Sequence, residues 1–192
     1  HSRAIKILSR GLTSKTLSAL AQNWCLILFD PKVFFNLVDP NKNIIVAFSG
    51  GGDSSALLHF CYELNQQGLL QGHLSAIHIN HSLSKHSDSW EDHCKIFCRE
   101  RNIDYQSYVV NINIKKSGLE SAARNARYKI FQEELQPNDQ LLMAHHADDV
   151  AETILFRLFR GTGLDGLQGP MKKRPLGKGV ILRPLLGYSK AD

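Results

Sequence analysis

Two short clusters in the sequence combine residue types that can bind phosphate and move protons. The first, called the glycine loop here, is Ser49-Gly50-Gly51-Gly52-Asp53-Ser54, between an apolar β-branched run and an apolar helical pattern. Glycines let a backbone turn sharply and approach an anion closely. The start of a helix offers N–H groups and a partial positive charge, and the serines add hydroxyl donors. The loop therefore predicts a site for phosphate or pyrophosphate oxygens.

The glycine loop differs from two common nucleotide-binding motifs. It lacks the lysine of GxxxxGK[ST], and Asp53 and Ser54 occupy later glycine positions of GxGxxG. An aspartate among phosphates would repel them unless a cation lay between, so Asp53 indicates Mg²⁺ held jointly with phosphate oxygens. The plain alternative is a glycine-rich turn whose aspartate or serine caps the next helix.

The second cluster, residues 145–149, reads His-His-Ala-Asp-Asp, and Glu152 follows one helical turn later. The helix dipole stabilises acids in a first helical turn, so capping explains part of this pattern. Carboxylates and imidazoles also accept protons in catalysis. They bind metals as well, and a zinc site stays open on ligand types alone. Both clusters become one active site if the fold places them at one edge of a sheet.

The spacing of apolar runs predicts the elements that position both clusters. β-branched runs alternate with helical patterns, which is typical of a parallel sheet covered by helices. We expect an α/β fold with an open, mostly parallel five-stranded sheet, helices on both faces, and strands at Ile44–Phe48, Leu74–Ile79, Tyr105–Val110, Leu141–Ala144 and Val180–Leu182. Ligands bind at the carboxyl ends of such strands. Since the first and fourth strands end at the two clusters, we expect the clusters to meet.

Helical patterns are expected over Ser54–Leu64, 88–101, Leu119–Leu135 and Asp148–Phe159. The last pattern carries an apolar stripe of Ala151, Ile154, Leu155 and Leu158, and we expect this stripe to face the sheet.

The stretch Gly161–Gly179 is rich in glycine and holds the basic run Lys172-Lys173-Arg174. This composition predicts a mobile functional loop rather than a regular element. We expect the catalytic domain over residues 43–192 and an N-terminal extension, helical or non-native, over residues 1–42.

Composition and charge limit the class of protein. The chain has 192 residues, 43% hydrophobic and 21% charged, which is typical of one globular domain. Its formal net charge of +5 is compatible with a polyanionic partner. No apolar run approaches the ~20 residues that span a bilayer, so we expect no membrane partner. The four cysteines show no CxxC spacing, which favours a reducing setting, and we expect the cytoplasm.

The pattern SGGxDS of the glycine loop resembles the N-type ATP pyrophosphatases. Later motifs in the chain narrow the resemblance: His78-x-x-His81, E-x-A-A-R-x-x-R-Y at residues 120–128, HHxDDxxET from His145, RGxGxxGL from Arg160, and RPLL from Arg183. In this order they resemble the tRNA(Ile)-lysidine synthetase family over roughly residues 43–188. Val150 stands where that family usually has Gln, and Ser82 where it commonly has Gly. Family members carry further C-terminal domains that grip tRNA, so we expect residues 1–192 alone to bind ATP but hold tRNA poorly.

The resemblance implies an enzyme that uses ATP to adenylate the wobble cytidine of isoleucine tRNA with anticodon CAU. Free L-lysine would then be joined to C2 of that base, releasing AMP. ATP binding is implied for Ser49, Gly50, Gly51, Gly52, Asp53 and Ser54, and Mg²⁺ binding for Asp53 and Asp149. Catalytic roles are implied for Asp53, Arg124, His145, Asp148 and Asp149. Candidate tRNA contacts are Arg127, Arg160, Lys172, Lys173 and Arg174.

Several alternatives stay open at this point. A PP-loop tRNA thiolase would share the ATP loop but needs catalytic cysteines, whereas Cys94 and Cys98 fit one apolar helix face. A non-catalytic nucleotide-binding module would not need Asp53 together with the cluster at 145–149. The sequence does not rank the acids and histidines as general base. It also leaves the oligomeric state open, a homodimer included.

Overall fold

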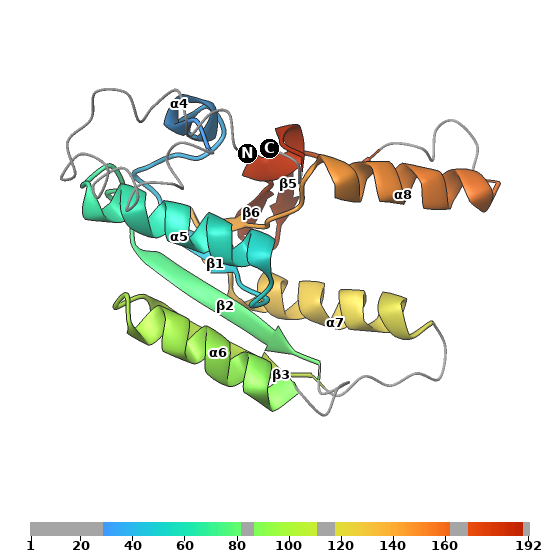
Figure 1. The fold of residues 1–192 in the computed structure, drawn as a ribbon, viewed down its shortest axis with the longest axis horizontal. Coiled ribbons are helices and arrows are strands. Elements are labelled where there is room, and N and C mark those ends of the chain that lie inside the picture. The colour runs from blue at the N-terminus through green and yellow to red at the C-terminus, as the bar shows by residue number, and fades with distance from the viewer. Residues whose placement is uncertain (1–28, 82–86, 111–117, 162–168, 190–192) are drawn as a thin grey trace, which may run out of the picture.

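The computed structural model describes residues 29–81, 87–110, 118–161 and 169–189. They build a layered α/β body around a six-stranded sheet of order β3-β2-β1-β4-β6-β5 (Figure 1). The strands are β1 (Ile44–Ala47), β2 (Leu74–Asn80), β3 (Asp104–Val109), β4 (Gln140–Leu142), β5 (Lys173–Leu176) and β6 (Gly179–Leu182). The helices are α4 (Pro31–Phe35), α5 (Gly52–Gln66), α6 (Ser87–Arg99), α7 (Leu119–Glu134), α8 (Ala147–Phe159) and the 3-10 helix η2 (Pro184–Gly187).

Five of the strands run parallel. β1 pairs with β2 and β4, β2 pairs with β3, and β4 pairs with β6. These are the five predicted strands, with small shifts at their ends. The predicted α/β class, an open and mostly parallel sheet with helices on both faces, is therefore confirmed, although the sheet has six strands instead of five.

The sixth strand, β5, corrects the prediction for the glycine-rich stretch. β5 pairs antiparallel with β6, from Lys173 opposite Leu182 to Leu176 opposite Gly179. Gly177 lies in the two-residue turn between them with a φ of 56°, a backbone region that tight hairpins require and glycine adopts without strain. A mobile loop is thus wrong for residues 173–179, because the glycines there make a hairpin. Residues 162–168 of the stretch lie outside the described residues.

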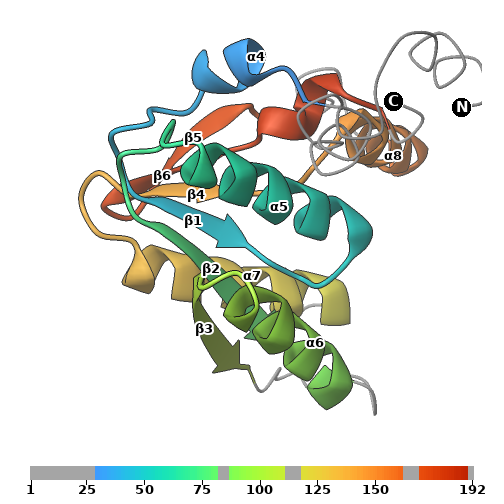
Figure 2. The same ribbon diagram turned by 60° about the vertical axis from the view of Figure 1, so that its left-hand side comes forward.

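Helices cover the sheet on both sides: α5 and α6 lie over one face and α7 over the other (Figure 2). Alternate strand residues point to opposite faces. Val46 and Leu142 therefore join the core beneath α5, where Leu57 is fully buried. Ile181 joins the second core, against Phe131 of α7. This double layer holds the strand ends, and the loops that follow them, in fixed positions.

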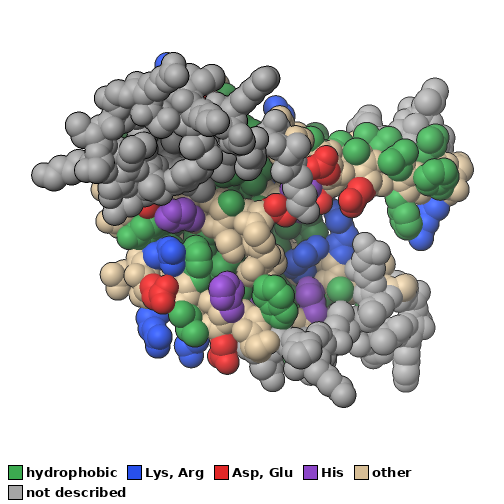
Figure 3. Space-filling model, viewed as in Figure 1, with side chains coloured by type: hydrophobic (Ala, Val, Ile, Leu, Met, Phe, Trp, Pro, Cys, Tyr) green, Lys and Arg blue, Asp and Glu red, His purple; other side chains and the backbone are tan. Residues whose placement is uncertain are grey.

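Helix α8 projects away from the sheet (Figure 1). None of its residues is buried, and it exposes the large apolar side chains of Leu155, Phe156, Leu158 and Phe159. Figure 3 shows hydrophobic side chains gathered on this projecting helix. The prediction that its apolar stripe faces the sheet is wrong. Helical periodicity identifies an apolar face but does not identify the neighbour that covers it.

The segment before β1 packs onto the domain. Asp30 caps the short helix α4 by accepting from the backbone N–H of Lys32 at 2.8 Å. Phe34 and Val38 are buried in the core beneath α5. Residues 1–28 lie outside the described residues, so the proposed boundary between an extension at 1–42 and the domain stays a prediction. No described helix is both long and apolar enough to cross a membrane.

Candidate active site

The two sequence clusters follow neighbouring strands. β1 leads into the glycine loop, β4 leads into residues 145–149, and these strands pair directly in the middle of the sheet. Helix α5 leaves β1 on one face of the sheet, whereas α7 enters β4 on the other (Figure 2). Such a change of direction opens a crevice beyond the carboxyl ends of the strands. The predicted meeting of the two clusters at one edge therefore follows from the topology.

Gly50 gives the glycine loop its shape. Its φ is 81°, in the left-handed region that favours glycine. A Cβ atom there would lie 2.9 Å from Cys94 Sγ and 3.3 Å from the Trp90 ring. Helix α6 therefore supports the loop from behind, and Gly51 forms the N-cap from which α5 begins at Gly52.

The serine hydroxyls hold the loop closed. Ser54 Oγ donates to the Gly51 carbonyl at 3.0 Å and accepts from the Ser49 N–H at 3.3 Å. The two hydroxyl oxygens lie 3.0 Å apart, and the Gly51 N–H donates to Ser49 Oγ at 3.4 Å. Both hydroxyls are thus engaged inside the loop. The donors that the loop offers a phosphate are backbone N–H groups at the start of α5.

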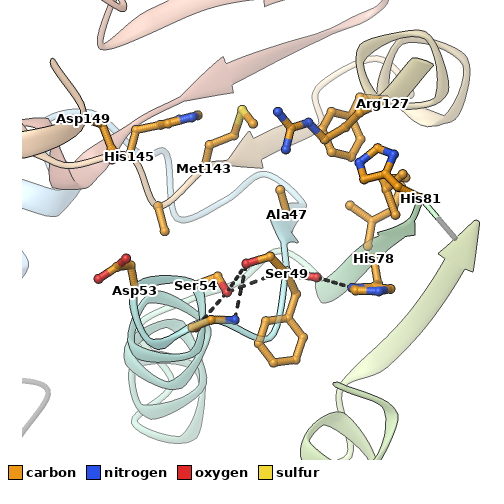
Figure 4. Close-up of a pocket in the computed structure, with 16 residues that line it drawn as sticks. Ala47, Ser49, Asp53, Ser54, His78, His81, Arg127, Met143, His145 and Asp149 are labelled. Carbon is orange, nitrogen blue, oxygen red and sulfur yellow. Dashed lines mark hydrogen bonds between the residues drawn. The ribbon is translucent and has the colours of Figure 1, made fainter. Parts of the chain in front are cut away.

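A cavity of about 390 Å³, the main cavity, opens in front of the loop. The glycine loop, the end of β2, the β4–α8 connection and two residues of α7 line it. Asp53 and Asp149 stand at one end, and Arg127 and His81 stand at the other (Figure 4). The cavity thus has an acidic end beside the glycine loop and a basic end beside α7.

His146 connects the acids at the acidic end. Its ring is 9% exposed, with Nε2 3.6 Å from Asp53 Oδ2. Its Nδ1 lies 3.5 Å from Asp148 Oδ2 and 3.6 Å from Asp149 Oδ2. The backbone N–H of His146 also donates to Asp149 Oδ2 at 2.8 Å. The glycine loop and the start of α8 are therefore linked through one buried imidazole.

The acidic end fits a divalent cation that needs few protein ligands. Asp53 and Asp149 are 44% and 37% exposed at their side chains, so their oxygens reach solvent beside the glycine loop. Among the residues that the structure describes, no group of three or more histidines, cysteines or acids could hold a metal ion. A zinc site, which needs three or four such ligands, is not formed there. Mg²⁺ usually takes one or two carboxylates together with phosphates and waters, which suits this arrangement.

His145 points the other way, toward the basic residues. Burial and the nearby Arg183 charge, against the opposing effect of Asp149, together lower the pKa of its imidazole to about 4. Arg183 Nε donates to His145 Nδ1 at 3.2 Å. At neutral pH the ring is therefore uncharged, with its proton on Nε2. His145 can donate a hydrogen bond into the cavity but is a weak base.

The basic end holds two buried nitrogens without hydrogen-bond partners in the described part of the chain. His81 Nδ1 and Arg127 Nε are buried, with no hydrogen-bond partner among the described residues. Burial lowers the pKa of both groups, and the Arg127 charge adds to the effect on His81. Buried polar atoms are nearly always satisfied in proteins. These two nitrogens therefore indicate that a ligand with acceptor atoms completes this end.

A second cavity, of about 200 Å³, adjoins the main one and shares His145 and Asp149 with it. Three arginines dominate its wall, and the full lining is Arg124, His145, Asp149, Thr153, Arg157, Pro170 and Arg183. With one carboxylate among these cations, the second cavity suits a ligand that carries both an anionic group and an amine.

The chain is similar to known proteins over most of its length. The PP-loop domain family matches residues 8–192. This chain belongs to the PP-loop family. The tRNA(Ile)-lysidine synthase of Coxiella burnetii is 42% identical over 160 residues, which cover 83% of this chain and 35% of that protein. The Pseudomonas aeruginosa tRNA(Ile)-lysidine synthase is 47% identical over 147 residues, covering 77% and 33%. The chain thus spans about a third of the length of these curated relatives.

A solved structure shares the fold of this chain. The U34-tRNA thiolase NcsA from Methanococcus maripaludis matches with a TM-score of 0.63 and 19% sequence identity, covering 93% of this chain and 62% of that chain. At this level of identity the likeness concerns the fold alone.

Of the remaining predicted site residues of this PP-loop domain, two line a cavity and four lie outside both cavities. Arg127 lines the main cavity, and Arg124 lines the second cavity. Lys172 precedes β5, Lys173 is its first residue, and both are exposed. Arg160 lies at the far end of α8 with its guanidinium 4.0 Å from the Phe156 ring, and it lines neither cavity. Arg174 is half-buried, 5.0 Å from the Tyr128 ring.

The residues of the site that were not among the predicted site residues include four from the motifs quoted above. His78 and His81 line the main cavity, Arg183 lines the second, and Tyr128 contacts Arg183. All four belong to motifs in the sequence, so the signal was present. Their roles depend on which strands are neighbours, and motif order alone does not reveal that.

Proposed function

We propose that this chain is the ATP-using domain of an enzyme that joins L-lysine to C2 of the wobble cytidine of isoleucine tRNA. The observation that carries this proposal is that the glycine loop, His145 and Asp149 all line the main cavity. The similarity to tRNA(Ile)-lysidine synthases over about four fifths of the chain supports the choice of substrates.

In the first step, O2 of the cytosine attacks the α-phosphorus of ATP. A new P–O bond forms, the bond between the α- and β-phosphates breaks, and pyrophosphate leaves. Backbone N–H groups at the start of α5 stabilise the charge that develops on pyrophosphate. Mg²⁺, held by Asp53 and Asp149, would supply further stabilisation of that charge. Arg127, at the basic end of the same cavity, contacts phosphate or the activated base.

In the second step, the ε-amine of lysine attacks C2, and the C–O bond to AMP breaks. An ammonium of pKa ~10.4 must first lose a proton, at a cost of about 4.6 kcal/mol at pH 7. His145 fits this task poorly because its Nδ1 accepts from Arg183 and its Nε2 already carries a proton, so the neutral ring has no free lone pair. Asp149 lines both cavities, so we assign the proton acceptor to Asp149, with Asp148 beside it.

Lysine itself fits the second cavity. Its carboxylate would face the arginines there, since guanidinium groups bind carboxylates through paired hydrogen bonds. Its amine would lie toward Asp149, at the wall shared with the main cavity. Neutral His145, with a proton on Nε2, would donate to the base or to the phosphate between them.

The described cysteines do not favour the thiolase alternative. Cys94 and Cys98 are fully buried, and burial raises the pKa of their thiols to about 12 and about 11. A thiol that stays protonated is a poor nucleophile. Cys25 lies outside the described residues.

The test is incorporation of labelled lysine into unmodified isoleucine tRNA, with ATP and Mg²⁺, by the product of the whole gene. We expect label in the tRNA, AMP as a product, and no label when the wobble cytidine is replaced by uridine. Asp53→Asn should abolish both label and AMP, whereas Asp149→Asn should slow lysine transfer more than it slows pyrophosphate release, because Asp149 is assigned to both steps. AMP formed on a different substrate, with no lysine incorporated, would overturn the proposal.

A further inference from the structure

Tyr128 of α7 gathers arginines from three elements. Its hydroxyl accepts from Arg183, which follows β6, at 3.2 Å. The guanidinium carbon of Arg124, one turn earlier on α7, lies 5.1 Å from the centre of the Tyr128 ring. The guanidinium carbon of Arg174, from the edge strand β5, lies 5.0 Å from the same centre. One aromatic side chain thus contacts three cations, which form the arginine cluster.

Among the side chains that the structure describes, no carboxylate oxygen lies within 4.0 Å of a side-chain nitrogen of the arginine cluster. Arg183 donates two further hydrogen bonds, both to neutral groups: His145 Nδ1 and the Met171 carbonyl. Arg174 Nε is buried and has no hydrogen-bond partner among the described residues. Burial lowers the pKa of Arg183, and the nearby charges of Arg174 and Arg124 lower it further.

The Tyr128 side chain can hold these arginines in place without neutralising their charge. A carboxylate would hold them firmly but would cancel their charge. The face of an aromatic ring attracts a guanidinium and leaves its full charge in place. Like charges held together in a partly buried site favour binding of an anion. Arg124 and Arg183 line the second cavity, so that is where the anion would bind.

We propose that Tyr128 is a positioning residue that holds Arg124, Arg174 and Arg183 as an uncancelled positive wall for the carboxylate of the amino-acid substrate. The identity of this anion rests on the proposed function. Arg174 does not line the second cavity, and it acts by adding charge behind Arg183. Arg174, the last residue of the basic run, is thereby assigned to the amino-acid site, whereas its neighbours Lys172 and Lys173 are exposed.

The experiment compares lysine with 1,5-diaminopentane, which is lysine without its carboxylate, in the tRNA incorporation assay. The variants are Tyr128→Leu, which removes ring and hydroxyl, Tyr128→Phe, which removes the hydroxyl, and Arg174→Gln. Lys178→Gln, in the exposed turn of the same hairpin, is the matched control. The readout is the ratio of kcat/KM for the two amines.

We expect Tyr128→Leu and Arg174→Gln to lower the preference for lysine about tenfold or more, and Tyr128→Phe to lower it about threefold. ATP KM should stay within about twofold, because the glycine loop is untouched. Lys178→Gln should match the parent. A merely structural role would slow both amines equally, so an unchanged ratio in Tyr128→Leu and Arg174→Gln would overturn the proposal.

A binding measurement separates this inference from the proposed function. Sodium acetate is titrated into ¹⁵N-labelled protein against sodium chloride of equal ionic strength, and the arginine Nε–H resonances are followed. Acetate should shift those of Arg124, Arg174 and Arg183 in the parent but not in Tyr128→Leu. This result would uphold the arginine cluster even if no lysine were incorporated. The absence of any acetate-specific shift in the parent would refute it.

Discussion

At the scale of single residues, adjacent histidines take different roles because their surroundings differ. His146 lies among three carboxylates and links the glycine loop to α8. His145 is held by Arg183, and burial with that positive neighbour keeps its ring uncharged. The sequence shows two equivalent letters at 145 and 146. The difference between them arises from partners 38 residues away in the chain, and spacing within a motif does not encode such partners.

The depressed pKa of His145 predicts a specific loss of stability in acid. The pKa is about 4 in the folded chain and 6.5 in its unperturbed state, so the unfolded chain binds the extra proton first as pH falls. Its contribution to stability is full above pH 6.5 and is lost as pH falls from 6.5 toward 4. His145→Asn, whose amide oxygen can accept from Arg183, should lose on the order of 1 kcal/mol less than the parent between about pH 7.5 and 5. Urea unfolding at both pH values measures this, and equal losses in the two proteins would contradict it.

Gly50 supports a second prediction at this scale. Gly50→Ala forces a side chain into a φ of 81° and places its Cβ 2.9 Å from Cys94 Sγ. We expect the free energy of unfolding to fall by about 2 kcal/mol or more. The matched control is Gly52→Ala, where a Cβ would meet no atom within 4 Å at the first position of α5. It should keep or slightly raise stability. Chemical denaturation of both variants decides the matter, and equal stabilities would show that Gly50 is not constrained.

At the scale of elements, most of the fold could be predicted from the periodicity of the apolar residues and the order of the strand and helix patterns. Five strands and four helices follow from β-branched runs alternating with helical patterns. The edge strand β5 and the placement of α8 could not be predicted, and each for a physical reason. β5 has few apolar residues, since an edge strand needs burial on fewer sides, and its turn glycine resembles loop composition. Helix α8 shows an apolar stripe, but the pattern does not state what lies against it.

The projection of α8 predicts a contrast between two phenylalanines. Phe159 is 84% exposed on α8, whereas Phe131 of α7 is 1% exposed in the core. Phe159→Ala should change the free energy of unfolding by no more than about 0.5 kcal/mol. Phe131→Ala should lower it by about 3–5 kcal/mol, because it leaves a cavity against β4 and β6. Urea unfolding of both variants tests the position of α8, and a large loss for Phe159→Ala would show that this helix packs against the domain.

At the scale of the whole molecule, the site arises where two halves of the sheet meet. β1 brings the glycine loop and β4 brings the acids and histidines, and the rule for open α/β sheets predicted that both clusters lie at the carboxyl edge of the sheet. The main cavity was therefore anticipated at the correct edge with most of its acidic end. The second cavity was not, because it depends on Arg183 after β6 and on the start of α8. Those segments are adjacent in space but distant in sequence.

The charge layout of the molecule gives the last prediction. Lys173 pairs with Leu182 at the carboxyl end of β6, so exposed Lys172 and Lys173 lie at the same sheet edge as the active site. If they contact tRNA phosphates, each should release about one counterion on binding.

The double variant Lys172→Gln with Lys173→Gln should reduce the slope of log K against log salt by about 1.5, measured for tRNA between roughly 50 and 300 mM KCl. Its affinity for ATP should not change, because neither lysine lines the main cavity. Lys178→Gln is the control at the opposite edge, in the turn that precedes β6. Replacing this lysine should leave the slope unaltered if the RNA approaches the carboxyl edge of the sheet. An equal reduction for Lys178→Gln would mean that tRNA is attracted by net charge alone.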